Sequence, residues 1–365
     1  MTKLYSLLVE KYGSIIEPKD IIECSTIENL GNTVLQKTIA RGAGGISQTD
    51  DTFSTRSSTP TITDPKTDYI DNGVMDNFLQ YEDIVLKQKF FVSSKGRRYE
   101  YYDGGEGEPL ILLTALAFVS TIWKHQVSQF SPKYRVIMPH LPGHGESFHN
   151  QKPFTFEEIA DELVELMDHL GITTANVVGW CLAGNIAQLV ALRHQSRLKT
   201  LTLLCTTPAD ARIRGISNED LILYSKDPLG TYVLEFQNIF KNRFTDNPMV
   251  NQFLQTIQQS HCNVDSEAVM YHIHNLFRFD TSQTLEQVKI PTLIISGKYD
   301  ITYPPEQVEL LHKGIEGSSY FEFEEAGHMP FLSDYELFNK VLSKFLNDHT
   351  GYENSWKPVQ VTEEI

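Results

Sequence analysis

The chain has 365 residues, 41% of them hydrophobic and 21% charged, and a formal net charge of −16 at pH 7. This length and composition allow a full hydrophobic core and more than one structural unit. The negative charge disfavours nucleic acids and anionic membrane surfaces, so we expect neither as a partner.

Cysteine usage and hydropathy bear on the cellular compartment. The four cysteines have no paired spacing, which fits a reducing environment better than a disulfide framework. The sequence contains no apolar run of about 20 residues, and its first residues lack the basic flank and cleavage site of a signal peptide. We therefore expect a cytoplasmic protein.

The first 80 residues divide into two parts. Residues 1–40 hold two short amphipathic patterns, one through Leu4, Leu7 and Leu8 and one opening at Ser25, which predict a helical segment. Residues 41–80 are rich in Gly, Ser, Thr, Asp and Pro over much of their length and cannot bury enough apolar surface to order themselves. We expect a flexible linker there.

Residues 81–350 alternate between strand and helix patterns, which predicts an α/β domain with a mostly parallel sheet and helices on both faces. The first two strands are expected to form an antiparallel edge. The expected strands are Lys89–Val92, Arg98–Tyr102, Leu110–Thr114, Arg135–Pro139, Ala175–Trp180, Thr200–Cys205, Thr292–Ser296 and Tyr320–Phe323. The expected helices are Phe156–Leu170, Leu182–His194 and Tyr335–Leu346.

Two further segments have a distinct pattern. Residues 209–288 carry no strand signal but repeat apolar residues at helical spacing, as in Met270, Ile273 and Phe277, which predicts a helical lid above the sheet. Residues 351–365 form a C-terminal tail, for which a docking peptide and a disordered end both remain open.

The most informative position is Cys181. It follows the apolar run that ends at Trp180 and precedes a helix pattern that begins at Leu182, with Gly179 and Ala183 two residues to either side. Small residues at these places allow a sharp strand-to-helix turn that exposes the side chain between them, so the pattern predicts a nucleophile. Without such flanking residues, the other cysteines are read as small buried hydrophobes.

Four motifs in chain order resemble those of the α/β-hydrolase superfamily, over about residues 85–348. They are the turn at Gly179–Gly184, the loop Leu141–Ser147, the strand and turn Ile290–Asp300, and the loop Ala326–Phe331. That superfamily normally has serine where this chain has Cys181. The resemblance implies an α/β-hydrolase fold and a Cys-His-Asp triad of Cys181, His328 and Asp300.

Each triad member has a chemical role. A thiolate attacks an acyl carbon, so Cys181 needs the helix dipole beside it and His328 to take its proton. Asp300 would orient the imidazole, and Asp210 is the alternative acid by analogy with carrier-linked thioesterases.

The family pattern also implies an oxyanion hole. Its donors would be the N–H of Leu182 and one from Leu116 or Ala117, of which we favour Leu116. The family usually has His-Gly where this chain has Thr114-Ala115, which puts the loop conformation in question. His140 replaces an acidic residue and is interpreted as structural.

Three residues beside these positions are expected to contact substrate: Trp180, Ala117 and Met329. We expect no bound cofactor and no metal. His272 and His274 are two residues apart and would diverge on a helix, so they do not predict a metal pair.

Residues 4–30 resemble the second half of an acyl carrier domain, whose phosphopantetheine-bearing serine would precede Met1. The resemblance implies a carrier domain upstream in the same chain as partner, with the acyl chain presented on its phosphopantetheine. The hydrolase-like domain would then be a thioesterase-like release domain of a polyketide or nonribosomal peptide synthase. An acyl group on Cys181 stays activated as a thioester, so we expect release to water, an amine or a hydroxyl as small-molecule acceptor.

Three alternatives remain open. The turn around Cys181 also resembles that of dienelactone hydrolases, which use cysteine on the same fold and act on small esters or lactones. The second alternative is a non-catalytic acyl-binding module, which is motivated by the altered Thr114-Ala115 loop. A further hypothesis is that Cys181 is an engineered replacement of serine.

Overall fold

The computed structural model describes residues 78–81, 84–147, 152–209, 264–300 and 302–349. They belong to a compact unit that spans Asp76–Ile365. The expected carrier-like segment (1–40), nearly all of the linker (41–80), Asp210, most of the lid and the tail (351–365) lie outside the described residues.

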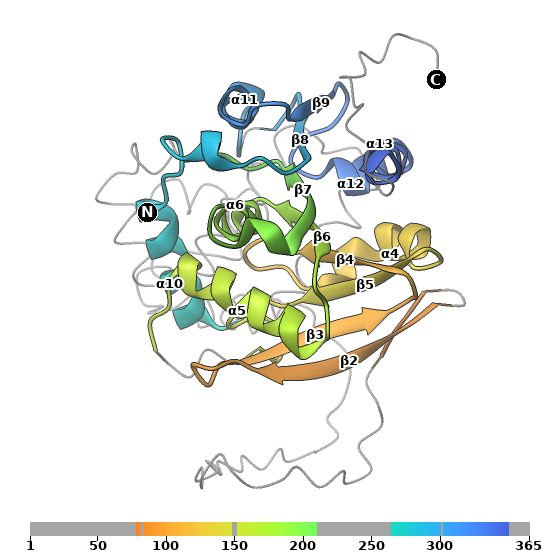
Figure 1. Ribbon diagram of the computed structural model, residues 1–365, viewed down its shortest axis with the longest axis vertical. Helices are drawn as coiled ribbons and strands as arrows, with labels where there is room; N and C mark the ends of the chain where they lie inside the picture. The colour runs from red at the N-terminus through yellow and green to blue at the C-terminus, as the bar shows by residue number, and fades with distance from the viewer. Residues whose placement is uncertain (1–77, 82–83, 148–151, 210–263, 301, 350–365) are drawn as a thin grey trace, which may run out of the picture. The chain divides into compact units, whose positions relative to one another are not determined.

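One sheet runs through the centre of the unit (Figure 1). Among the described residues it has nine strands, in the order β1-β2-β3-β5-β4-β6-β7-β8-β9. Their bounds are β1 Phe78–Tyr81, β2 Ile84–Val92, β3 Arg98–Gly104, β4 Glu108–Leu113, β5 Tyr134–Pro139, β6 Ala175–Trp180, β7 Leu198–Leu204, β8 Thr292–Gly297 and β9 Ser319–Phe323.

The direction of the strands divides the sheet in two. The pairs β1–β2, β2–β3 and β3–β5 are antiparallel, and every pair from β5 through β4 to β9 is parallel. This confirms the mostly parallel sheet and the antiparallel pairing of its first two predicted strands. The additional edge strand β1 was not predicted, because its four residues carry no clear alternation.

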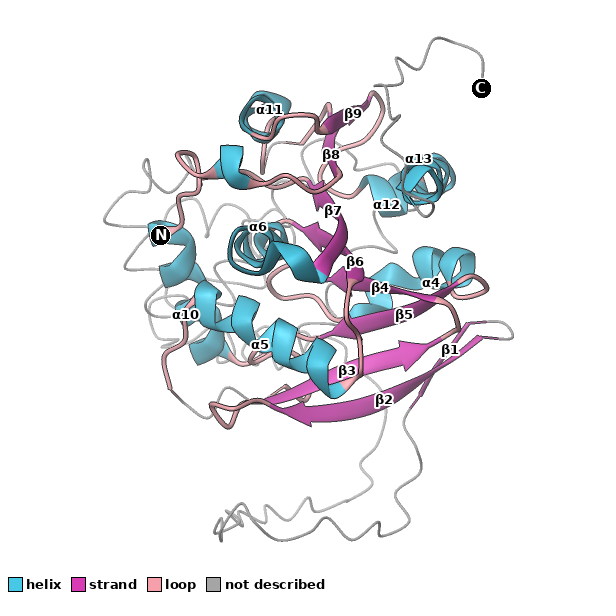
Figure 2. Ribbon diagram, viewed as in Figure 1, coloured by secondary structure: helices cyan, strands magenta, loops and turns pink. Residues whose placement is uncertain are grey.

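Helices cover both faces of the sheet, as Figure 2 shows by colour. α5 and α6 pack together on one side, whereas α4, α12 and α13 lie on the other. The α-helices are α4 Lys124–Phe130, α5 Phe156–His169, α6 Leu182–His194, α10 Ser266–Arg278, α11 Pro305–Gly314, α12 Pro330–Ser333 and α13 Tyr335–His349. The 3₁₀ turns are η2 Ser120–Trp123, η3 Gln195–Arg197 and η5 Leu285–Gln287.

Local sequence explains these elements. Every residue of β6 and of β8 is buried, as expected of central parallel strands covered on both faces. α5 begins with a capping box in which Thr155 accepts the N–H of Glu158 and the Glu158 side chain accepts the N–H of Thr155. The predicted boundaries of α5 and α6 therefore hold to within one residue.

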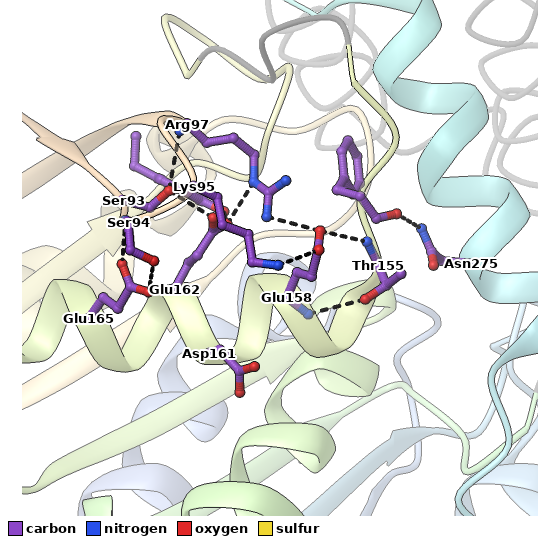
Figure 3. A network of polar contacts seen from close by, with 12 residues as sticks. Ser93, Ser94, Lys95, Arg97, Thr155, Glu158, Asp161, Glu162, Glu165 and Asn275 are labelled. Atoms are coloured by element: carbon purple, nitrogen blue, oxygen red, sulfur yellow. Dashed lines mark hydrogen bonds and ion pairs between the residues drawn. The ribbon is translucent and has the colours of Figure 1, made fainter.

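The hairpin between β2 and β3 is fixed to α5 by a polar network (Figure 3). Glu162 accepts hydrogen bonds from Ser93 Oγ at 2.7 Å, Arg97 Nε at 2.8 Å and Tyr99 Oη at 2.5 Å. Arg97 and Glu162 are almost completely buried, so each needs the other as a counter-charge. The network joins the antiparallel edge of the sheet to the helix layer.

Of the expected lid (209–288), the structure describes Ala209 and residues 264–288. There α10 forms where Met270 and Ile273 show helical spacing, and Asp265 caps it by accepting the N–H of Ala268. Asn275 of α10 donates to the carbonyl of Phe154, just before α5, at 2.7 Å (Figure 3). Among the described residues, no helix is long and apolar enough to cross a membrane.

Candidate active site

Cys181 occupies the sharp turn between β6 and α6. Its φ of 56° lies in the left-handed region that non-glycine residues rarely adopt, and it is the N-cap residue of α6. Its N–H donates to Leu204 O at 3.0 Å, and its carbonyl accepts the N–H of Gly184 at 2.9 Å. The strained turn expected from the sequence is therefore present, and it places the sulfur beside the positive end of the helix dipole.

The small residues around Cys181 are required by close contacts. A Cβ on Gly179 would lie 2.6 Å from Ala183 O and 2.8 Å from Ala187 Cβ. A Cβ on Gly184 would lie 2.5 Å from the Thr206 side chain. Any larger side chain would push the helix away from the sheet, so these positions keep the turn tight.

Asp300 and His328 come together at the carboxyl ends of the strands. His328 Nδ1 and Asp300 Oδ2 are 2.7 Å apart, and both residues are buried. The other oxygen of Asp300 accepts the N–H groups of Thr302 at 2.8 Å and Tyr303 at 3.0 Å. The carboxylate is thus fixed on both sides, so that it can orient the imidazole.

The electrostatics of His328 tie it to both partners. Burial lowers its pKa, but the negative charges of Asp300 and Cys181, together with hydrogen bonds to both, outweigh burial and raise the pKa to about 9. At neutral pH this favours the imidazolium form of His328. A positive imidazolium beside a cysteine sulfur is one of the features that activate a nucleophilic cysteine.

The loop between β4 and η2 (residues 114–119, hereafter the β4–η2 loop) contains the two residues expected to offer the second oxyanion donor, Leu116 and Ala117. Ala117 has a φ of 66°, and its N–H donates to His144 Nε2 at 2.8 Å. That amide is already used, whereas Leu116 N–H and Leu182 N–H have no hydrogen bond to any described residue. The geometry thus favours Leu116 over Ala117 as donor.

His140 contacts Ser120, the first residue of η2 and the residue just after this loop. Its Nε2 accepts the N–H of Ser120 at 2.9 Å and contacts Ser120 Oγ, and its Nδ1 lies 2.9 Å from Glu100 Oε2. All three side chains are buried. These contacts agree with the structural interpretation of His140.

Two residues expected to contact substrate are deeply buried. Trp180 is 0% exposed, and its indole N–H donates to the carbonyl of His328 at 3.0 Å. Met329 is 4% exposed and is the N-cap residue of α12. The structure therefore gives Trp180 a contact with the backbone of His328, which the sequence did not suggest.

Cys205, interpreted from sequence as a small buried hydrophobe, lies beside the same site. It follows β7 with a φ of 45°, one position beyond the pair Trp180–Leu204, as Cys181 does on β6. Burial raises the pKa of its thiol well above the usual range, and the neighbouring Asp300 carboxylate adds to this effect. Cys205 is fully buried, in agreement with its interpretation as a small buried hydrophobe, and pairing of the two strands brings both cysteines to one edge of the sheet.

One cluster among the described residues has donor atoms close enough for a metal ion. One donor atom from each of Cys205, Asp300 and His328 lies within 4.8 Å of the others, and all three residues are buried. Asp300 and His328 already bond to each other in this cluster. The arrangement is therefore accounted for by an acid and base pair. The more distant His272 and His274 do not join it.

The mostly parallel sheet, the helices on both of its faces and the position of the candidate site are those of an α/β-hydrolase fold. A sequence profile described as "alpha/beta hydrolase fold" matches residues 108–220. An esterase from Thermogutta terrifontis superposes with a TM-score of 0.65 at 24% identity, over 72% of this chain and 99% of the esterase. An enol-lactonase from Burkholderia xenovorans LB400 gives 0.64 at 24%, over 71% and 100%. The predicted fold is confirmed.

Among curated proteins the chain is similar to pimeloyl-[acyl-carrier protein] methyl ester esterases. The protein from Vibrio vulnificus (strain YJ016) is 26% identical over 247 residues, covering 66% of this chain and 95% of that protein. The protein from Neisseria meningitidis serogroup C is 28% identical over 244 residues, covering 61% and 89%. These relatives support an α/β-hydrolase, and they do not support the expected synthase release domain.

Proposed function

We propose that the chain is an acyl hydrolase that uses Cys181 as nucleophile, His328 as base and acid, and Asp300 to orient His328. The observation that carries this proposal is the His328–Asp300 contact of 2.7 Å beside a cysteine at φ 56° on the N-terminus of α6. A pKa of about 9 for His328, raised by both neighbours against the effect of burial, supports the same assignment.

The proposed reaction has two steps. The Cys181 thiolate attacks the acyl carbon, and the N–H groups of Leu116 and Leu182 receive the oxyanion. His328 donates its proton to the leaving group, which departs and leaves the acyl group on sulfur. His328 then takes a proton from water or another acceptor, which attacks the acyl-enzyme and restores Cys181.

We propose that the acyl chain is presented on the phosphopantetheine of a carrier domain. The names of the curated relatives, which act on a carrier-linked pimeloyl methyl ester, support this class of substrate. The carrier would be bound in trans or reached in cis. No cofactor is needed in this scheme, since the cysteine, imidazole and carboxylate supply all the groups that react.

Two bonds in such a substrate are open to attack. The thioester to pantetheine is favoured by the sulfur of Cys181, because exchange between two thioesters is nearly balanced in free energy. The relatives favour instead an ester at the far end of the acyl chain. A carrier loaded with a dicarboxylic acyl chain, methyl-esterified at its free end, distinguishes the two.

Intact mass spectrometry of that carrier is the test. Loss of the methyl group with the thioester retained identifies an esterase, and return of the carrier to its unloaded form identifies a thioesterase. Both reactions should disappear in the Cys181→Ala variant. An unchanged carrier after incubation with the wild-type chain, or equal turnover by Cys181→Ala, would contradict the proposal and favour an acyl-binding module.

A thioester on Cys181 also remains reactive toward amines. Supplying an amine during turnover should therefore yield amide beside free acid, with the ratio rising with amine concentration. Free acid alone at every concentration would limit the enzyme to hydrolysis. Cleavage of small lactones or esters at a rate above that of the carrier substrate would favour the dienelactone-hydrolase-like alternative.

A further inference from the structure

Two imidazoles accept backbone hydrogen bonds from the β4–η2 loop and from the residue just after it. His144 Nε2 accepts the N–H of Ala117 at 2.8 Å, and His140 Nε2 accepts the N–H of Ser120 at 2.9 Å. Both histidines come from the turn after β5 (residues 140–147). That turn therefore contacts the loop at Ala117 and the first residue of η2, Ser120, just after the loop.

His144 can make its contacts only as one neutral tautomer. Its Nε2 is an acceptor, and its Nδ1 lies 3.2 Å from Pro142 O, to which it donates. The side chain is 0% exposed, and burial lowers its pKa well below the usual range, with the neighbouring His272 adding to the effect. A neutral imidazole at this place is a permanent acceptor for the Ala117 amide.

α10 fixes the turn that carries His144. His272 Nε2 is 2.9 Å from the same Pro142 oxygen, and the rings of His144 and His272 meet edge to face at 5.4 Å. Asp265 N–H donates to Gly143 O at 2.8 Å, and a Cβ on Gly143 would collide with Ala268. The helix thus lies directly against the turn.

The position of Ala117 matters because of its neighbour. A φ of 66° is strained for alanine and needs support from outside the loop. The peptide between Leu116 and Ala117 is planar, so fixing the Ala117 N–H also fixes the plane of the Leu116 carbonyl and limits the rotations open to Leu116. An oxyanion donor must be aimed before the reaction to be effective.

We propose that His144 is a positioning residue for this reaction: by accepting the Ala117 N–H it holds Leu116 N–H in the direction of the oxyanion. The proposal rests on the proposed function of Cys181. It gives two elements, the turn after β5 and the helix α10, a role in supporting the oxyanion hole, although neither touches the reacting atoms.

The test compares two reactions of Cys181 in the full chain. Alkylation by iodoacetamide needs the thiolate but no oxyanion hole, whereas acylation by an acyl-pantetheine thioester needs both. His144→Leu fills the space with an apolar side chain but offers no acceptor to the Ala117 N–H. It is expected to slow acylation about 10- to 100-fold, which is less than the effect of removing a whole oxyanion donor. Alkylation should stay within about twofold of wild type.

Two further variants make the result specific. His144→Gln offers an amide oxygen to Ala117 and should restore most of the acylation rate. His349→Leu removes another buried histidine, which bonds Phe345 O on α13, and should leave both reactions unchanged. Equal acylation by His144→Leu and wild type, or an equal fall in alkylation and acylation, would overturn the proposal.

Hydrogen exchange separates this proposal from the proposed function. Peptides covering residues 114–120 should exchange faster in His144→Leu than in wild type or His349→Leu, whether or not the chain turns over substrate. Unchanged exchange would overturn the role of His144. If exchange differs between His144→Leu and wild type but the wild-type chain is never acylated, only the assignment of Cys181 is overturned.

Discussion

The indole N–H of Trp180 donates a hydrogen bond to the backbone carbonyl of His328 at 3.0 Å. The residue just before Cys181 therefore holds the loop that carries the proposed base. The indole also packs against Phe118 and Phe331, with ring centroids 4.9 Å apart in each case. One buried side chain thus links the position of the proposed nucleophile to that of the proposed base.

Replacement of this indole should affect turnover more than folding. Trp180→Phe keeps an aromatic ring but loses the hydrogen bond, and kcat/KM is expected to fall about 3- to 10-fold, the worth of one neutral hydrogen bond. Trp123→Phe is the matched control, since Trp123 is equally buried and its indole N–H has no hydrogen bond to a described residue. A similar fall in both variants would show that only packing is involved.

The rate of acylation should depend on the protonation of His328. Because its pKa is raised to about 9, the imidazolium persists through neutral pH and is lost as the pH rises through about 9. Proton donation to the leaving group should therefore fail above about pH 9. The stability contributed by the raised pKa is fully present below about pH 6.5 and is lost as the pH rises to about 9. Stopped-flow measurement of the acylation rate from pH 6 to 10 should show this decrease, which is the alkaline limb of the pH profile.

The matching variant for this pH limb is Asp300→Asn. Loss of the carboxylate charge should move the limb to lower pH, since that charge raises the pKa of His328. A limb that stays in place in Asp300→Asn would show that another group titrates.

Glu100 should stabilise the fold in a pH-dependent way. Burial raises its pKa, but hydrogen bonds from His140, Glu146 N–H and Gln88 outweigh this effect and lower the pKa from 4.5 to about 2. The stabilisation is present above about pH 4.5 and is lost as the pH falls toward 2, because the carboxylate becomes protonated. Glu100→Gln should cost at most about 3 kcal/mol at pH 7 and little near pH 2.

Urea unfolding at several pH values tests this dependence. Glu106→Gln, on the exposed turn before β4, serves as control and should follow the wild-type curve. A constant difference between Glu100→Gln and wild type across the whole range would contradict the expected linkage.

The buried pair of Arg97 and Glu162 should be sensitive to loss of one partner. Glu162→Gln leaves the guanidinium without its buried counter-charge, although Glu158 remains 3.0 Å from Arg97 Nη2. We expect the free energy of unfolding to fall by about 3 kcal/mol. Glu165→Gln, which removes the charge that accepts from Ser94 at the surface (Figure 3), should cost less than about 1 kcal/mol.

The end of β8 leaves no room for a side chain. A Cβ on Gly297 would overlap the carbonyl of Gly327, next to His328. Gly297→Ala should therefore displace the His328 loop and lower kcat more than it raises KM. Gly327→Ala is the control from the same contact, since its Cβ would meet only Tyr299 O at 3.4 Å. Equal kcat values for Gly297→Ala and wild type would show that the loop adapts.

Local patterns in the sequence determined most of the sheet and three positions of the candidate site. β6 and β8 were predicted because buried parallel strands are continuous apolar runs, and α5 begins at its predicted residue, Phe156, where the structure adds a capping box of Thr155 and Glu158. Cys181, Asp300 and His328 each end or follow such an element with a motif of its own. Signals of this kind lie within a few residues of each other and need no knowledge of distant contacts.

Only the tertiary structure decided how these positions are supported. Trp180 meets His328 across 148 positions of sequence, and Ala117 meets His144 across 27, through bonds that no local pattern encodes. Cys205 reaches the site because β7 pairs with β6 in register, which its own flanking residues do not reveal. Sequence periodicity determines which face of an element is buried, but the partner of a buried polar group depends on how strands and loops meet in three dimensions.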